Sequence, residues 1–129
     1  MNSDKVRKWI ERVEYDMLTA EAMLDAGRYI YAVFMCQQAV EKSLKALITY
    51  SDIDVLPVHN LRRLFEISGF INELDEERLM KLDFLSQYYI NARYKEDITE
   101  LSKGITREFS ADIIIFSKEM IKWIMKKMK

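Results

Sequence analysis

The chain has 129 residues, of which 50% are hydrophobic and 32% are charged. This balance is typical of one globular domain and is too apolar for a disordered chain. The 20 lysine and arginine residues nearly balance the 21 aspartate and glutamate residues. A net charge of −1 excludes a general electrostatic attraction to nucleic acid or to a membrane. We therefore expect a single domain over 1–129, in which any anion site is local.

Three glycines and one proline leave few places for turns, which favours a few long helices over many short strands. The longest apolar run, 29–36, is far shorter than the roughly 20 residues of a membrane span. The first residues contain no apolar run of signal-peptide length. We therefore expect a cytoplasmic protein that does not enter a membrane. The one cysteine, Cys36, is expected to be a core residue in a reducing compartment.

Apolar residues recur at helical spacing in five segments. Gly27 and Gly69 are expected to end the first and third of these, because glycine readily adopts the left-handed conformation that terminates a helix. Asp75 is expected to cap the fourth, and Ser3 or Asp4 the first. The fold class is therefore all-α, a bundle of four long helices plus one short helix. The predicted helices cover 3–26, 29–50, 59–68, 75–94 and 105–127, with a loop at 51–58 and a polar connector at 95–104.

The helix predicted over 29–50 is apolar around roughly half its circumference, which indicates the central helix of the bundle. Small side chains on this helix allow a neighbouring helix to approach closely. Gln38, Glu41, Lys42 and Lys45 occupy the opposite side. We interpret these four residues as a solvent-exposed face with charge pairs at helical spacing.

Charged residues also lie beside the apolar stripes of three helices. Asp16 lies at the edge of the first stripe, Arg93 points along the core, and Asp112 lies beside the stripe of the last helix. A buried guanidinium stays charged and needs a partner. We therefore expect Arg93 to pair with Asp16 or Asp112 as a structural polar group.

The last predicted helix carries a second apolar stripe, formed by Ile114, Ile121, Met125 and Met128. One surface helix needs only one stripe. The second stripe is explained either by burial between two neighbours in the bundle or by a homodimer interface. The sequence leaves both explanations open.

The one histidine, His59, stands at the start of the short predicted helix. A histidine in this position more commonly caps the helix or packs as an aromatic ring than acts in catalysis. No second histidine exists, and no cysteine or carboxylate lies near it at metal-ligand spacing, so we predict no metal site. The chain also lacks a glycine-rich phosphate loop and a nucleophile elbow, and we predict no cofactor.

Several short motifs, in order over nearly the whole chain, resemble those of the HEPN family, named for its occurrence in higher eukaryotes and prokaryotes. Each motif is weak alone, and together they are fairly specific. They are Trp9 with Asp16-Met17 and Ala20, Tyr29-Ile30-Tyr31-Ala32, Gln37-Gln38-Ala39-Val40-Glu41-Lys42-Ser43-Leu44-Lys45-Ala46-Leu47, His59-Asn60-Leu61 after Pro57, Tyr89-Ile90-Asn91-Ala92-Arg93-Tyr94, and Ile121-Lys122-Trp123-Ile124.

The resemblance implies an up-and-down bundle and a homodimer. It also implies pairing with a small nucleotidyltransferase, often as a toxin–antitoxin couple, and binding of a nucleotide or RNA. Ribonucleases of the family carry an arginine and a histidine with four to six residues between them. Arg93 matches this arginine, but Ile98, Thr99 and Glu100 stand where the histidine is expected.

Three functions follow as hypotheses. The first is a non-catalytic module that holds a nucleotide or RNA phosphate near Arg93, Tyr94, Lys95 and Lys45. The alternative is a metal-independent ribonuclease in which Arg93 works with His59 or another base. The third is a purely structural dimer, in which the polar groups only specify packing.

Overall fold

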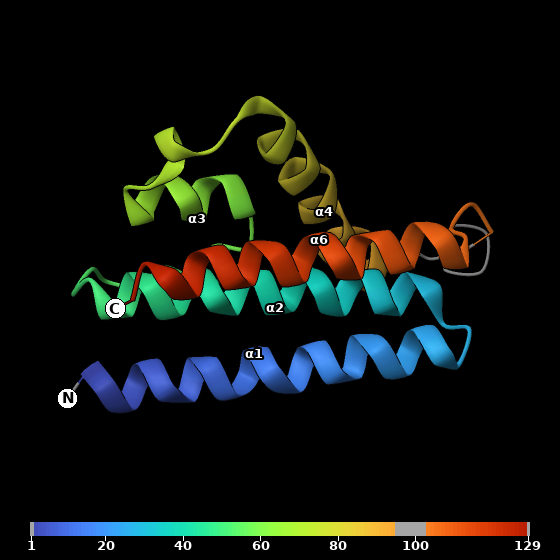
Figure 1. Cartoon of the computed structure of the whole chain (residues 1–129), viewed down its shortest axis with the longest axis horizontal. Helices are drawn as coiled ribbons and strands as arrows, with labels where there is room; N and C mark the ends of the chain where they lie inside the picture. Colours follow the sequence, from blue (N-terminus) through green and yellow to red (C-terminus); the bar gives the residue numbers. More distant parts are fainter. Residues whose placement is uncertain (1, 95–102, 129) are drawn as a thin grey trace.

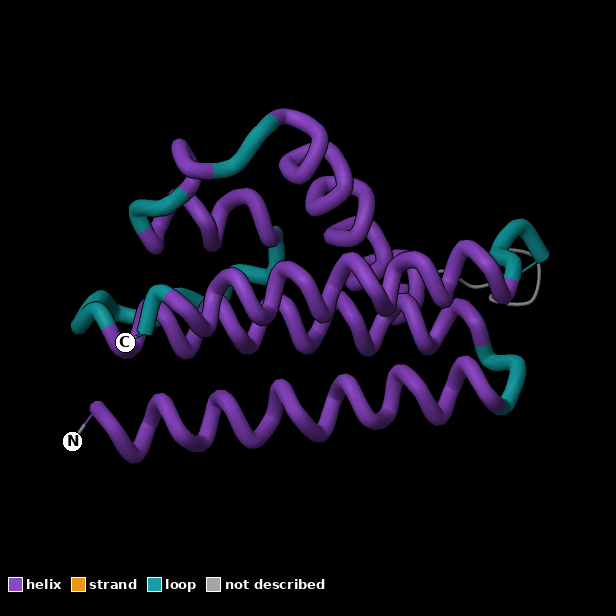
Figure 2. The backbone as a smooth tube through the Cα atoms, viewed as in Figure 1, coloured by secondary structure: helices purple, strands orange, loops and turns teal. Residues whose placement is uncertain are grey.

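The structure, a computed structural model, describes the backbone of residues 2–94 and 103–128, and the side chains of these residues except 90–94. Most of the predicted connector at 95–104, including Lys95, therefore lies outside the described residues. The described part is helical and contains no strand, as Figure 2 shows.

Four long helices and one short helix form an up-and-down bundle, so the predicted fold class is confirmed (Figure 1). One 3₁₀ turn, η1, was not predicted. The elements are α1 (Asn2–Asp25), α2 (Tyr29–Tyr50), α3 (Leu61–Ser68), η1 (Ile71–Glu73), α4 (Glu76–Tyr94) and α6 (Arg107–Lys126).

The helix ends follow the local chemistry of the chain. Gly27 and Gly69 have φ angles of 76° and 85°, the left-handed conformation predicted for both. Asp75 caps α4, since its Oδ1 accepts a hydrogen bond of 2.9 Å from the backbone N–H of Arg78. The prediction that the short helix begins at residue 59 was wrong, because the Asn60 side chain caps α3 instead.

Helix α2 is the centre of the molecule and contacts α1, α3, α4 and α6. Every residue from Ala39 to Thr49 is buried. Ala32, Ala39 and Ala46 are completely enclosed. The central position predicted for this helix is therefore confirmed.

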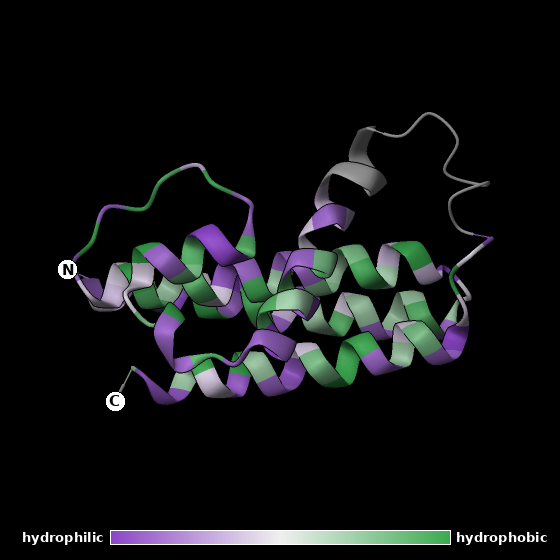
Figure 3. Cartoon of the chain, turned by 90° about the horizontal axis from the view of Figure 1, so that it is seen from above, coloured by the Kyte–Doolittle hydropathy of each residue, from purple (hydrophilic) through white to green (hydrophobic). Residues whose placement is uncertain are grey.

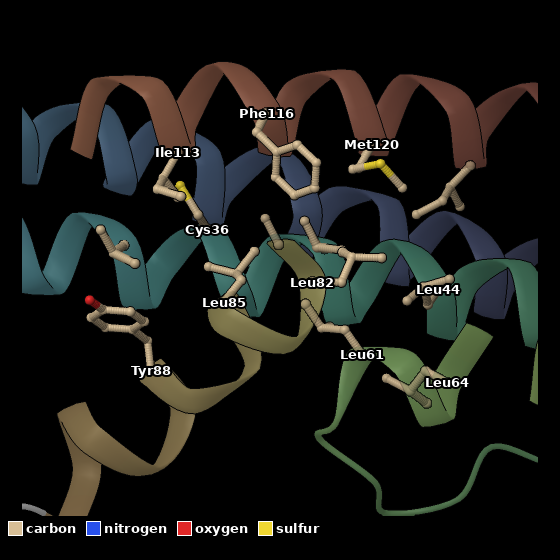
Figure 4. Close-up of a cluster of buried hydrophobic side chains, with 14 of the residues drawn as sticks. Cys36, Leu44, Leu61, Leu64, Leu82, Leu85, Tyr88, Ile113, Phe116 and Met120 are labelled. Carbon is tan, nitrogen blue, oxygen red and sulfur yellow. The ribbon is translucent and has the colours of Figure 1, made fainter. Parts of the chain in front are cut away.

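The hydrophobic core joins α2 to its neighbours, and Figure 4 shows side chains of α3, α4 and α6 meeting those of α2. Cys36 is fully enclosed there, as predicted, and burial raises the pKa of its thiol to about 12. Polar and apolar residues alternate along the helices (Figure 3), and no described helix is long and apolar enough to cross a membrane.

The second apolar stripe of the last helix faces the interior of the bundle over much of its length. Ile114 is buried, while Ile121, Met125 and Met128 are half-buried and pack against the core. Packing by neighbours within the bundle therefore accounts for this stripe. A role of these residues in a homodimer stays a prediction.

Candidate functional site

A fully buried carboxylate, that of Glu41, lies in the middle of α2. Its oxygens accept hydrogen bonds from Lys45 Nζ at 2.9 Å and from Gln37 Nε2 at 3.0 Å. Lys42 Nζ lies 3.5 Å away. Gln37 and Lys45 each stand four residues from Glu41, so they reach it from the turns before and after. A single helix thus supplies both the anion and three of its donors.

A further donor to Glu41 comes from the segment before α3. His59 Nδ1 lies 3.1 and 3.2 Å from the two carboxylate oxygens. Burial raises the pKa of Glu41, but the charge of Lys42 and the hydrogen bond from Lys45 outweigh it, so the pKa falls below its ordinary value. An ionised carboxylate can only accept hydrogen bonds, so Nδ1 of His59 carries a proton that points at Glu41.

The His59 ring is fixed from two sides. It stacks on Tyr89 with the ring centres 3.9 Å apart and the planes tilted by 13°. Gln37 Nε2 also donates to the His59 backbone carbonyl at 2.9 Å. The side chain of His59 is still 41% exposed. The histidine is therefore packed as an aromatic ring, and one edge of it reaches solvent.

Two further charges complete the buried group. Lys42 Nζ donates to Gln38 Oε1 at 3.1 Å, and burial lowers the pKa of Lys42 although the charge of Glu41 opposes the shift. Burial raises the pKa of Asp16, while the charges of Lys42 and Arg12 oppose this. We call Asp16, Glu41, Lys42 and Lys45 the charge cluster. It balances two anions with two cations.

The interpretation of this side of α2 as a solvent-exposed face was wrong. Glu41, Lys42 and Lys45 are all buried, and Gln38 is half-buried. Helix α1 brings Asp16 and Trp9 against one edge of the face, and the segment before α3 lays His59 against the other. Pairs at a spacing of four residues look the same in sequence whether they are exposed or enclosed.

An open groove borders the charge cluster between α1 and the loop after α2. Its volume is about 580 Å³. Trp9 lines the groove, donates from Nε1 to Thr49 Oγ1 at 3.1 Å, and lies under Lys45 Nζ, 6.0 Å from the ring centre. We call it the α1 groove, lined by Asn2, Lys5, Lys8, Trp9, Arg12, Thr49 and 52–55.

The basic residues of this groove were not among the predicted ligand-binding residues. Lys5, Lys8 and Arg12 recur at steps of three and four residues, which places them on one side of a helix next to Trp9. That spacing was a usable signal. The loop that forms the other wall carries no comparable signal.

The residues predicted to bind a ligand or to act as structural polar groups are only partly placed. Lys45 is buried and bonded to Glu41, while Asp112 is exposed on α6. Arg93 and Tyr94 lie in the last turn of α4, and their side chains are outside the described residues. Arg93 follows Tyr89 by four positions, so its backbone lies one turn beyond the ring that stacks on His59. In the described part of the chain, no three potential ligand residues gather as a metal site.

The fold places the chain among the small all-α proteins built as an up-and-down helical bundle, here with a central helix that carries an enclosed charge cluster. The family model of the HEPN domain matches residues 6–128, so the chain belongs to the HEPN family.

Two solved structures share this fold. One is ST0689, an archaeal HEPN homologue, with a TM-score of 0.77 and 23% identity over 96% of this chain and 98% of that chain. The other is TT1696 from Thermus thermophilus, with a TM-score of 0.84 and 23% identity over 98% of this chain and 99% of that chain. No curated protein matches the chain.

Proposed function

We propose that this HEPN protein is a non-catalytic module that binds the phosphates of a nucleotide or of RNA in the α1 groove. The observation that carries the proposal is the arrangement of Lys5, Lys8 and Arg12 around the half-buried indole of Trp9. Lysine and arginine neutralise phosphates, and an indole face stacks on a base of any sequence. A net charge of −1 makes such a local concentration of cations more distinctive.

The shape and the second wall of the groove suit the same ligand class. A volume of about 580 Å³ falls within the roughly 300–1,000 Å³ of small-molecule sites. Asp52 and Asp54 stand on the loop opposite the basic residues. Carboxylates accept hydrogen bonds from ribose hydroxyls and repel phosphate, so the ligand lies with its phosphates toward α1. The resemblance to the family adds Arg93, Tyr94 and Lys95 as a second part of the proposed site.

Ligand binding can be tested by fluorescence. In a Trp123→Phe background, Trp9 is the only tryptophan. We expect ATP or a short single-stranded RNA to quench Trp9, and Lys8→Ala with Arg12→Ala to weaken binding about tenfold or more, with a shallower salt dependence. Lys122→Ala, on the exposed side of α6, is the matched control. Absence of binding to both probes by fluorescence and by calorimetry would contradict the proposal.

The family resemblance also supports a partner. We propose that the protein forms a homodimer and pairs with a small nucleotidyltransferase, as one component of a toxin–antitoxin couple. Co-expression with the product of the adjacent gene tests the pairing. We expect the two proteins to purify together. An adjacent gene of another class, or separate elution of the two proteins, would count against it.

A metal-independent ribonuclease is the second candidate, and the contact between Glu41 and His59 favours it. The carboxylate holds the imidazole by Nδ1, so in a neutral ring Nε2 carries the lone pair that a general base needs. His59 Nε2 would take the proton of a ribose 2′-hydroxyl, whose oxygen attacks the adjacent phosphorus. The bond from phosphorus to the 5′-oxygen breaks, and the leaving 5′-oxygen takes a proton from water. Arg93 would hold the phosphate charge.

Cleavage of RNA by the pure protein tests this candidate. A ribonuclease of this kind loses activity in His59→Ala and in Arg93→Ala. Cleavage that persists in both variants would point to a contaminant. An uncleaved RNA that still binds the α1 groove would leave the binding module as the function.

A further inference from the structure

Helices α4 and α6 both pack on α2. Where the two helices meet, the Phe84 ring of α4 packs edge-on against the Phe109 ring of α6, with the ring centres 5.6 Å apart. Between them lies a groove of about 370 Å³. Phe109, Ile113 and Phe116 of α6 line it from one side. The groove is separate from the α1 groove and from the charge cluster.

The rim of this groove is apolar and exposed. Met80 and Phe84, one turn apart on α4, are 62% and 41% exposed. Ile115 on α6 is 57% exposed and extends the apolar surface outward. Large apolar side chains gathered at one place mark a contact surface more strongly than single ones do. Met80 and Phe84 form a ridge beside the groove, and the Phe84 ring also packs edge-on against Phe109 of the same chain. The exposed part of this ridge can enter the same groove on a second copy.

The two walls of the groove carry opposite charges, which favours contact with a second copy of the same surface. Lys81 stands on the α4 wall and Asp112 on the α6 wall, and both are exposed. Within the chain, Lys81 Nζ lies 5.5 Å from the ring centre of Phe116 and makes an exposed ion pair of 3.4 Å with Glu77. An exposed ion pair of this kind contributes little to stability. In a two-fold contact the same surface serves both partners, so opposite charges on opposite walls meet twice. A surface charged with one sign would instead repel its own copy.

We propose that this groove is the surface through which two copies of the chain associate. The Met80–Phe84 ridge of each protomer lies in the groove of the other, and Lys81 of each pairs with Asp112 of the other. The proposal rests on the homodimer proposed above and names its surface. The proposed surface is not the stripe of Ile114, Ile121, Met125 and Met128, since that stripe packs within the bundle.

Sedimentation equilibrium of the full chain tests the proposal. We expect a dimer whose dissociation constant rises about tenfold or more in Met80→Glu and in each charge reversal, Lys81→Asp and Asp112→Lys. The double reversal restores the pairing, so we expect its dissociation constant to return close to that of the wild type. Leu18→Glu, an equally exposed position on α1 at 68%, is the control and leaves the dimer intact. Circular dichroism confirms that each variant is folded.

The outcomes separate the surface from the homodimer itself. A monomeric wild type overturns both. A dimer that tolerates Met80→Glu and both single reversals overturns this surface and leaves the homodimer standing. A double reversal that is weaker than either single reversal shows that Lys81 and Asp112 do not meet, and it also overturns the proposed pairing.

Discussion

At the scale of single residues, the molecule depends on a carboxylate that is enclosed but not isolated. Glu41 accepts from Gln37, Lys45 and His59, and Lys42 adds a second positive charge. Transfer of an ion from water into a protein is costly unless it is paired and hydrogen-bonded. The cluster is stable because the donors converge on the anion. Loss of that one anion would leave all of these donors without their acceptor.

Removing the charge of Glu41 should leave Lys42 and Lys45 without their anion. We expect Glu41→Gln to lower the free energy of unfolding by about 3–5 kcal/mol, the cost of breaking a buried ion pair from one side. Urea denaturation measures this loss. Glu11→Gln breaks an exposed pair with Arg7 at the same spacing and should change little. Equal losses in the two variants would show that the cluster is energetically ordinary.

Asp16 should respond to pH in the opposite direction from Glu41. Burial raises the pKa of Asp16 above 3.8, so ionised Asp16 costs stability, and the cost disappears as pH falls through the raised pKa. The lowered pKa of Glu41 gives stability above pH 4.5 that is lost as pH falls toward the folded-state pKa.

We therefore expect Asp16→Asn to melt at a higher temperature than the wild type at neutral pH. The difference should shrink on acidification, because the wild-type carboxyl then also becomes neutral. Thermal melts recorded from about pH 7 to about pH 3 measure it. An Asp16→Asn variant that melts lower at neutral pH would show that the attraction of Lys42 and Arg12 dominates over burial.

At the scale of secondary-structure elements, α3 is the helix most dependent on its ends. It has only eight residues, and isolated helices of that length are unstable in water. Asn60 supplies the cap, Gly69 the left-handed end, and Ser86 Oγ of α4 accepts from the Leu61 N–H at 2.9 Å. The position of His59 against Glu41 follows from where this helix begins.

Loss of the α3 cap should be measurable. Asn60→Ala removes the acceptor for the backbone N–H of Arg63 and should cost about 1 kcal/mol of unfolding free energy. Asn60→Asp keeps an acceptor oxygen and should retain most of the stability. The two variants are compared by urea denaturation. If both lose the same amount, the cap is not the cause.

The sequence predicted the long helices to within two residues at their ends, because apolar periodicity, glycine stops and the Asp75 cap are local signals. It did not predict that Glu41, Lys42 and Lys45 are enclosed. Their burial depends on where α1 and the segment before α3 lie, which no spacing within α2 encodes. The α1 groove was missed for the same reason, since residues 52–55 of its second wall belong to a loop.

At the scale of the whole molecule, the bundle is organised around α2 and not around a shared central axis. Neighbouring helices contact α2 on its several sides, while α4 and α6 border an apolar groove and meet through the rings of Phe84 and Phe109. The stability of the fold should therefore be concentrated in residues of α2. The ligand and dimer contacts proposed above lie on the outer surfaces of α1, α4 and α6.

A truncation in α2 should be far more harmful than the same truncation outside. Leu44→Ala removes a completely buried side chain and should cost about 2–5 kcal/mol. Leu18→Ala removes a side chain that is 68% exposed on α1 and should cost little. Chemical denaturation of both variants gives the comparison. A small loss in Leu44→Ala would mean that the surrounding helices collapse readily into the space.

Because Cys36 is enclosed, the reactivity of its thiol can be used to follow opening of the bundle. Its sulfur has no exposed surface, and its pKa of about 12 leaves almost no thiolate at neutral pH. A thiol reagent added to the native protein can modify Cys36 only when α2 separates from its neighbours. Because the chain has no other cysteine, the rate of labelling reports how often the bundle opens, without any engineered probe.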